Sequence, residues 1–271
     1  MRSPRWWACR AGRASGACHA ATAWRRRRCA RRCRSTSAAA TAARTLELLA
    51  ELPPGVARRT QALRLRLQAA RLAHQPFEAL RTARLLAKHQ GFSPAAAQGL
   101  VRSLAIEALD TGRDADQLRR VWRELDAADR RDVHVAAHAA RRLAAVGATE
   151  EARNALRPFW ERIATLTREE RDALAPAFAE TVDGLGPEWL PRLEAALLAW
   201  PREPALAYAV GRAFAARQLW GKARQLLEDA AADAALAPAA RREAWLQLAA
   251  MAEHDEDPSR AASCFRAAAA A

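Results

Sequence analysis

The sequence predicts an all-α protein, a right-handed α-solenoid of stacked helical hairpins. Of its 271 residues, 51% are hydrophobic, and Ala, Leu, Arg and Glu, which favour helices, are the commonest residue types. No alternating run of β-branched residues bounded by turn residues occurs, as a strand would require. Amphipathic helical segments recur roughly every 35–40 residues, a regularity typical of stacked hairpins.

The clearest repeat lies in residues 204–271. When Gly211 is placed at position eight of a 34-residue unit, small and apolar residues fall at the packing positions of a tetratricopeptide repeat. These residues are Ala207, Val210, Phe214, Ala223, Leu227 and Ala230. A shift of 38 residues gives a second set, Trp245, Leu248, Ala249, Ala261, Phe265 and Ala268. The sequence therefore predicts two hairpins of this type.

Small residues define the expected helix crossing in the first of these hairpins. We expect Gly211 and Ala223 to lie where the two helices meet, with Phe214 filling space beside them. Trp220 is expected to pack over the turn, and Gly221 to supply the left-handed backbone that ends a helix.

The earlier part of the chain follows the same scheme less regularly. A leucine-rich helix from Thr45 is expected to stop at the Pro-Pro-Gly sequence 53–55. The expected hairpins span about 60–92, 94–130, 133–165, 204–237 and 242–271. In the helix after Arg59, we expect Leu63, Leu67 and Ala70 to share the buried face.

Helix starts and breaks follow from local sequence. We expect Ser93 and Thr149 to be N-caps, and residues 167–170 to form a capping box. Pro158 should kink or break its helix, since proline removes a backbone donor. Two more prolines lie inside helical patterns, at 176 and 191, and the sequence assigns no hairpin to residues 166–203.

The net charge of +14 is unevenly distributed. Residues 1–44 contain twelve arginines and no acidic residue, so residues 45–271 are nearly neutral. Four of the five cysteines also lie in residues 1–44, and Cys264, expected to be buried beside Phe265, is the fifth. We expect residues 1–44 to be disordered, or to be GC-rich DNA translated in the wrong frame.

Three other interpretations of residues 1–44 remain open. Arginines with interspersed tryptophans are typical of nucleic-acid-binding arms. Four cysteines with His19 could bind zinc, although they lack the paired spacing of zinc modules, so no metal site is predicted. An Arg-rich start without acids is also typical of an organelle transit peptide.

Three segments resemble one family. They are Leu85-Leu86-Ala87-Lys88-His89, Leu219-Trp220-Gly221-Lys222-Ala223-Arg224 and Glu243-Ala244-Trp245-Leu246-Gln247-Leu248-Ala249. Over about residues 42–271 the chain is similar to the HemY proteins of bacterial haem biosynthesis. This resemblance implies an inner-membrane tetratricopeptide protein that organises other enzymes in the late steps of protohaem synthesis and is not itself an enzyme.

The start of the chain departs from that family. Family members begin with two hydrophobic membrane helices, whereas this chain has no stretch approaching 18 apolar residues. The resemblance thus predicts inner-membrane association, while the chain as given predicts a soluble cytoplasmic protein. An unrelated flavin-dependent oxidase shares the family's name, but no Gly-x-Gly-x-x-Gly motif after a strand occurs here.

The repeat register also predicts a binding groove, because the first helix of each hairpin lines the concave side of such a solenoid. The inward positions hold Gln61, Arg64, Gln68, Arg71, Arg102, His134, Arg141, Tyr208 and Arg212. We expect this groove to be basic and to bind an acidic protein segment, or carboxylates such as porphyrin propionates, through arginine. The alternative is that arginine is simply the default solvated cation of this chain.

No catalytic or cofactor site is predicted. His134 and His138 are four residues apart on one helix, a spacing that could bind a metal or haem iron, but no third ligand accompanies them. No base or nucleophile with an oriented partner is recognisable. The function predicted is a non-enzymatic scaffold in haem biosynthesis. A generic adaptor, a nucleic-acid binder acting through the arginine-rich segment and a direct porphyrin or haem binder are the alternatives.

Overall fold

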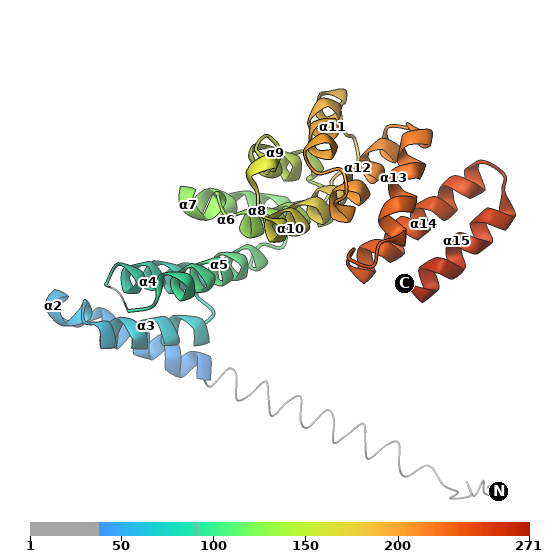
Figure 1. Ribbon diagram of the computed structural model, residues 1–271. Coiled ribbons are helices and arrows are strands. Elements are labelled where there is room, and N and C mark those ends of the chain that lie inside the picture. Colours follow the sequence, from blue (N-terminus) through green and yellow to red (C-terminus); the bar gives the residue numbers. More distant parts are fainter. Residues whose placement is uncertain (1–37, 90) are drawn as a thin grey trace, which may run out of the picture. The chain divides into compact units, whose positions relative to one another are not determined.

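The computed structural model describes residues 38–89 and 91–271, and these residues are helical with no strand (Figure 1). The chain divides into two compact units, Met1–Gly91 and Phe92–Ala271. The all-α prediction is confirmed for the described residues. Within them, no helix is both long enough and apolar enough to cross a membrane.

Unit 1 contains one clear hairpin. A helix over 38–50 and the short α2 (Pro54–Ala57) precede α3 (Thr60–Leu72) and α4 (Pro76–Lys88), which pack on each other. Leu63, Leu67 and Ala70 form the buried face of α3, as predicted, because they recur at helical spacing.

The boundary expected at residue 44 is wrong. Residues 38–44 are helical, and Ala42 is only 4% exposed, because they form the first turns of the helix that continues to residue 50. Residues 1–37, with their arginines, tryptophans and cysteines, lie outside the described residues.

Unit 2 consists of helices in sequence order. They are α5 (Pro94–Asp110), α6 (Ala115–Glu124), α7 (Ala127–Arg130), α8 (Val133–Ala145), α9 (Thr149–Trp160), η1 (Ile163–Thr165), α10 (Arg168–Ala179), η2 (Pro187–Trp189), α11 (Leu190–Ala199), α12 (Pro204–Ala216), α13 (Trp220–Ala232), α14 (Pro238–His254) and α15 (Pro258–Ala270). α8 packs on α9, α12 on α13 and α14 on α15.

The segment without a predicted hairpin supplies an internal part of the packing. α10 lies between α8 and α12 and packs on both, while α11 contacts α9 and α12. Pro158 does not break α9, which continues to Trp160, and α10 runs through Pro176. Each proline leaves the carbonyl four residues earlier without its helical partner, and those residues, Asn154 and Asp172, are exposed to water.

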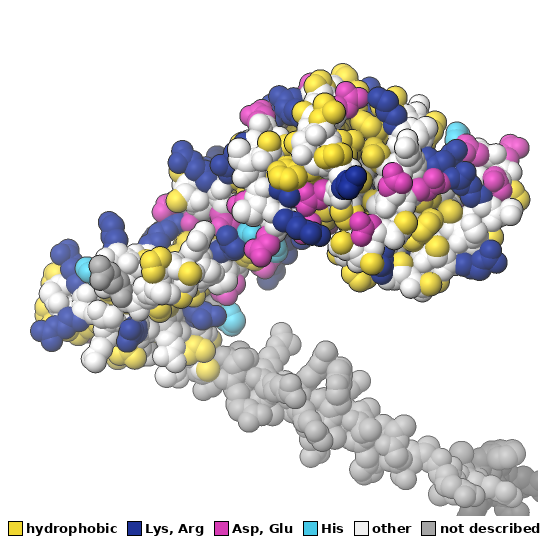
Figure 2. Space-filling model, in the orientation of Figure 1, with side chains coloured by type: hydrophobic (Ala, Val, Ile, Leu, Met, Phe, Trp, Pro, Cys, Tyr) yellow, Lys and Arg dark blue, Asp and Glu magenta, His cyan; other side chains and the backbone are white. Residues whose placement is uncertain are grey.

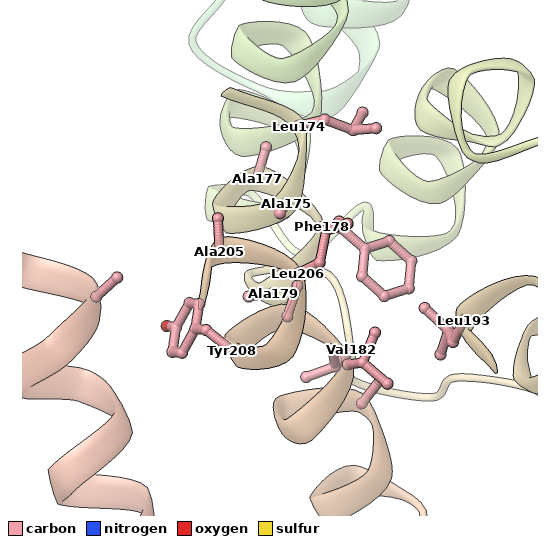
Figure 3. Packing of buried hydrophobic residues seen from close by; sticks show 14 of the residues in the cluster. Leu174, Ala175, Ala177, Phe178, Ala179, Val182, Leu193, Ala205, Leu206 and Tyr208 are labelled. Carbon is pink, nitrogen blue, oxygen red and sulfur yellow. The ribbon is translucent and has the colours of Figure 1, made fainter. Parts of the chain in front are cut away.

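Aromatic side chains fill the middle of unit 2. The Phe178 ring lies 4.8 Å from that of Trp160 and 5.0 Å from that of Trp189, measured between centroids. Figure 3 shows Phe178 of α10 and Leu193 of α11 pointing toward one another. Both side chains are fully buried, so the hydrophobic core passes continuously through the segment that holds the prolines.

Two predicted caps are confirmed and one is wrong. Ser93 accepts a hydrogen bond from the backbone N–H of Ala96, and Thr167 forms a capping box with Glu170. Thr149 is instead the first residue of α9, after an N-cap at Ala148, and its hydroxyl donates to the carbonyl of Asp183 at 3.4 Å.

The crossing of α12 and α13 agrees with the repeat register. A Cβ atom built on Gly211 would lie 2.8 Å from Cγ of Leu227, so the two helices approach too closely for any side chain there. Ala223 is fully buried. Gly221, however, lies inside α13, and the left-handed residue that ends α12 is Gln218, with φ of 59°.

Ion pairs join hairpin 94–130 to hairpin 133–165, and hairpin 204–237 to hairpin 242–271. Arg102 pairs with Asp132 (2.8 Å), Arg119 with Glu151 (2.6 Å) and Arg212 with Glu243 (3.0 Å). These partners are 30, 32 and 31 residues apart in sequence. Arg260 pairs with Glu228 at a separation of 32 residues. These separations are six to eight residues shorter than the 38-residue repeat of residues 204–271, so each pair joins successive hairpins about two helical turns away from equivalent positions.

Candidate functional site

Three of the predicted groove residues lie together in unit 2. Arg141 comes from α8, and Tyr208 and Arg212 come from successive turns of α12. Two carboxylates that the sequence analysis missed lie with them, Glu180 after the last residue of α10 and Glu243 in α14. We call these five residues the polar cluster.

Arg212 is the central group of the polar cluster. Its guanidinium contacts a carboxylate oxygen of Glu243 at 3.0 Å and donates to the Tyr208 hydroxyl at 3.4 Å. Arg141 Nε lies 3.4 Å from a carboxylate oxygen of Glu180, an ion-pair distance without hydrogen-bond geometry. The cluster therefore connects the first helices of successive hairpins through charged side chains.

Burial perturbs two groups of the polar cluster. Partial burial raises the pKa of Glu180, and the positive charges of Arg141 and Arg212 oppose that shift. Burial likewise raises the pKa of Tyr208, which is 5% exposed, and the positive charge of Arg212 again opposes it. Both shifts follow from partial desolvation of the cluster, which also strengthens interactions between its charges.

The expected excess of positive charge is absent from this cluster. Its two arginines face two glutamates, and Arg102 is paired with Asp132. Over the face drawn in Figure 2, basic and acidic side chains are interspersed on the helices of unit 2. The sequence analysis missed Glu180 because this residue follows the end of α10 and not an inward position of a first helix. It missed Glu243 because the first helix of the last hairpin, α14, was left out of the predicted groove.

The remaining predicted groove residues are placed elsewhere. Gln61, Arg64, Gln68 and Arg71 are exposed on α3 in unit 1, where Arg64 donates to the carbonyl of Gly91 at 3.3 Å. His134 is partly buried near the start of α8.

The two histidines of α8 do not form a common site. Nε2 of His138 lies 2.8 Å from a carboxylate oxygen of Asp110, which also accepts a hydrogen bond from Arg142. Within residues 38–89 and 91–271, no group of three or more His, Cys, Asp or Glu side chains is arranged to hold a metal ion.

The repeat-defining residues fall into two groups. Gly211, Phe214, Ala223 and Ala261 are buried, and Trp220 and Trp245 are partly buried against the core. Phe265 was expected to pack in the core but is 44% exposed on α15.

A hollow lies at the loops before α12 and after α13. It has a volume of about 470 Å³ and is lined by Arg168, Arg171, Trp200, Pro201, Arg202, Glu203, Pro204, Asp233 and Ala235. Its floor is a buried ion pair, in which Nε of Arg171 donates to Glu203, and the Arg171 guanidinium lies 3.7 Å from the centre of the Trp200 ring. Arg171 and Glu203 are 5% and 8% exposed. Since both charges are satisfied by each other, this pair is a structural bond between α10 and the start of α12.

Comparisons with known proteins provide no further identification. The chain matches no protein-family model and no curated protein.

Proposed function

We propose that this protein is a non-enzymatic interaction scaffold whose hairpins stack as a right-handed, tetratricopeptide-like solenoid. The observation that carries the proposal is the set of ion pairs between successive hairpins, which recur at similar separations of 30–32 residues. Stacked repeats bury their cores between neighbours and leave a continuous face of first helices open to extended ligands.

The polar cluster is the part of that face best suited to bind a partner. The side chains of Arg141 and Glu180 are 41% and 53% exposed, so a partner can reach both. Arg212 is 19% exposed and is held in place by Glu243. An acidic segment of a partner protein would compete with Glu180 for Arg141 and offer a planar carboxylate to the arginine donors.

Site-specific photo-crosslinking in cells tests this proposal. A photoreactive residue at Arg141 is expected to give adducts with partner proteins, because that position lies in the polar cluster. The matched control is the same residue at Gln225, an exposed position of α13, a second helix. Equal adducts at both positions, or none at Arg141, would refute the assignment of the binding face.

A role in haem biosynthesis at the inner membrane is the further part of the proposal. It is supported by the segments 85–89, 219–224 and 243–249, which resemble HemY proteins. Cells that lack the gene should accumulate porphyrin intermediates, and the wild-type gene should reverse this accumulation. Normal porphyrin content in such cells would leave a generic adaptor as the function. Direct tetrapyrrole binding would be favoured if titration with haem shifts the absorbance spectrum and His134→Ala weakens that shift.

A further inference from the structure

Equivalent apolar residues of α15 and α13 differ in their exposure to solvent. Phe265 occupies the repeat position that Leu227 occupies 38 residues earlier in the chain. Leu227 is completely buried, whereas Phe265 is 44% exposed. Leu227 faces α12 in its own hairpin, since a Cβ atom on Gly211 would lie 2.8 Å from Leu227 Cγ. Phe265 thus exposes an apolar ring at a position that is buried in the preceding hairpin.

The C-terminal end of a helix covers α13. The His254 ring, in the last turn of α14, lies 5.5 Å from the Trp220 ring. Asp255, the next residue, forms an ion pair with Arg224 of α13. The end of α14 therefore lies on the first turns of α13 and matches their charge, with an acid opposite an arginine.

The corresponding place on α15 is an acidic hollow. It has a volume of about 470 Å³ and is lined by Glu253, Glu256, Asp257, Pro258, Ala261, Ala262 and Phe265. Asp257 caps α15 by accepting a hydrogen bond from the N–H of Arg260. The side chains of Glu253 and Glu256 have no ion-pair partner among the described residues.

We propose that this hollow, which we call the α15 end site, binds the C-terminal end of an amphipathic helix from another protein, with Lys or Arg in its last turn. The apolar stripe of that helix covers Phe265, and its last turn takes the place on α15 that the end of α14 takes on α13. A helix C-terminus carries partial negative charge, so three neighbouring carboxylates would repel it unless cations lie in the last turn. The proposal uses the repeat register but does not depend on the polar cluster.

A pair of synthetic peptides tests the α15 end site. The probe has the sequence of residues 238–256 with Glu253, Asp255 and Glu256 each replaced by Lys, and the control peptide keeps the natural sequence. Fluorescence anisotropy with the full chain should show binding of the lysine peptide that is about tenfold tighter or more. Raising NaCl from about 0.05 to about 0.5 M should weaken the binding of the lysine peptide, because salt screens exposed charges.

Protein variants show whether binding occurs at this site. The double change Glu253→Lys with Glu256→Lys should abolish binding of the lysine peptide, and Phe265→Ala should weaken it about fivefold or more. A matched control, Glu169→Lys with Asp229→Lys, alters the net charge equally at two other exposed positions and should leave binding unchanged.

Several results would overturn the proposal. Equal affinity for the two peptides, no binding of either, or loss of binding in the control variant would each do so. A molar mass that rises with protein concentration, and falls to the monomer value in Phe265→Ala, would make a second copy of this chain the occupant instead. Because Arg141→Ala should leave peptide binding intact, this test remains separate from the test of the polar cluster.

Discussion

The substitution Gly211→Ala tests the helix crossing on which the repeat register depends. The added methyl group would lie 2.8 Å from Cγ and 3.0 Å from Cδ2 of Leu227, and 3.3 Å from Cβ of Leu226. Leu227 is completely buried, so a shift of its side chain would disturb the core residues around it. Overpacking of this kind costs about 1–3 kcal/mol, against a gain of about 1 kcal/mol from replacing glycine inside a helix. We expect a net loss of up to about 2 kcal/mol.

Gly221→Ala is the matched control. Gly221 lies in α13, and a Cβ atom there would have no neighbour within 4 Å. The same chemical change should therefore stabilise the protein, by about 0.5 kcal/mol, through reduced entropy of the unfolded chain. The two glycine substitutions thus have opposite expected signs.

Urea denaturation followed by tryptophan fluorescence measures both variants. All six tryptophans of the described residues lie in unit 2, so the signal reports on the unit that contains both glycines. In a thermal melt, a change of 1 kcal/mol shifts the midpoint of a unit of this size by about 2–4 °C. If Gly211→Ala stabilises as much as Gly221→Ala, the close crossing of α12 and α13 is wrong.

Three further predictions follow from burial. Glu203→Ala should cost about 3–5 kcal/mol in urea denaturation, because it leaves Arg171 charged, buried and unpaired; a cost below about 1 kcal/mol would contradict the buried ion pair. Leu227→Ala should cost about 2–5 kcal/mol, whereas Phe265→Ala should cost less than about 1 kcal/mol despite its equivalent register, and equal losses would show that Phe265 is covered. In an NMR titration, the Glu180 carboxyl should have a midpoint above its ordinary pKa of 4.5. Because the pKa of Glu180 is raised in the folded state, this carboxyl stabilises the protein below pH 4.5, and the contribution is lost as the pH rises through the folded pKa. Glutamine cannot ionise, so Glu180→Gln should gain stability relative to wild type as the pH rises from 4.5 through that folded pKa.

Local signals in the sequence predicted individual helices well. The helix expected from Arg59 to His74 is observed as Thr60–Leu72, with the expected buried face. The N-cap at Ser93 and the capping box of Thr167 with Glu170 were also predicted from the sequence alone. These features depend on residues within one or two helical turns of each other, so the sequence carries them without knowledge of the fold.

Proline was a misleading local signal in residues 158–203. Its cost in a helix assumes that the freed carbonyl finds no other partner. In α9 and α10 the freed carbonyls belong to exposed residues, and burial of Phe159 and Phe178 next to these prolines favours the helix. Only packing against neighbouring helices decided that α10 continues and lies between α8 and α12.

The sequence by itself determined the all-α class, most helix positions and the register that places Gly211 at a crossing. The tertiary structure decided which charges meet: Arg141 with Glu180, Arg212 with Glu243 and Arg171 with Glu203. It also decided that Leu227 is covered while its repeat equivalent Phe265 is exposed. Helix formation and capping are governed by residues within a few positions of each other. Pairing and burial depend on side chains about one hairpin apart, which only the packing of helices brings together.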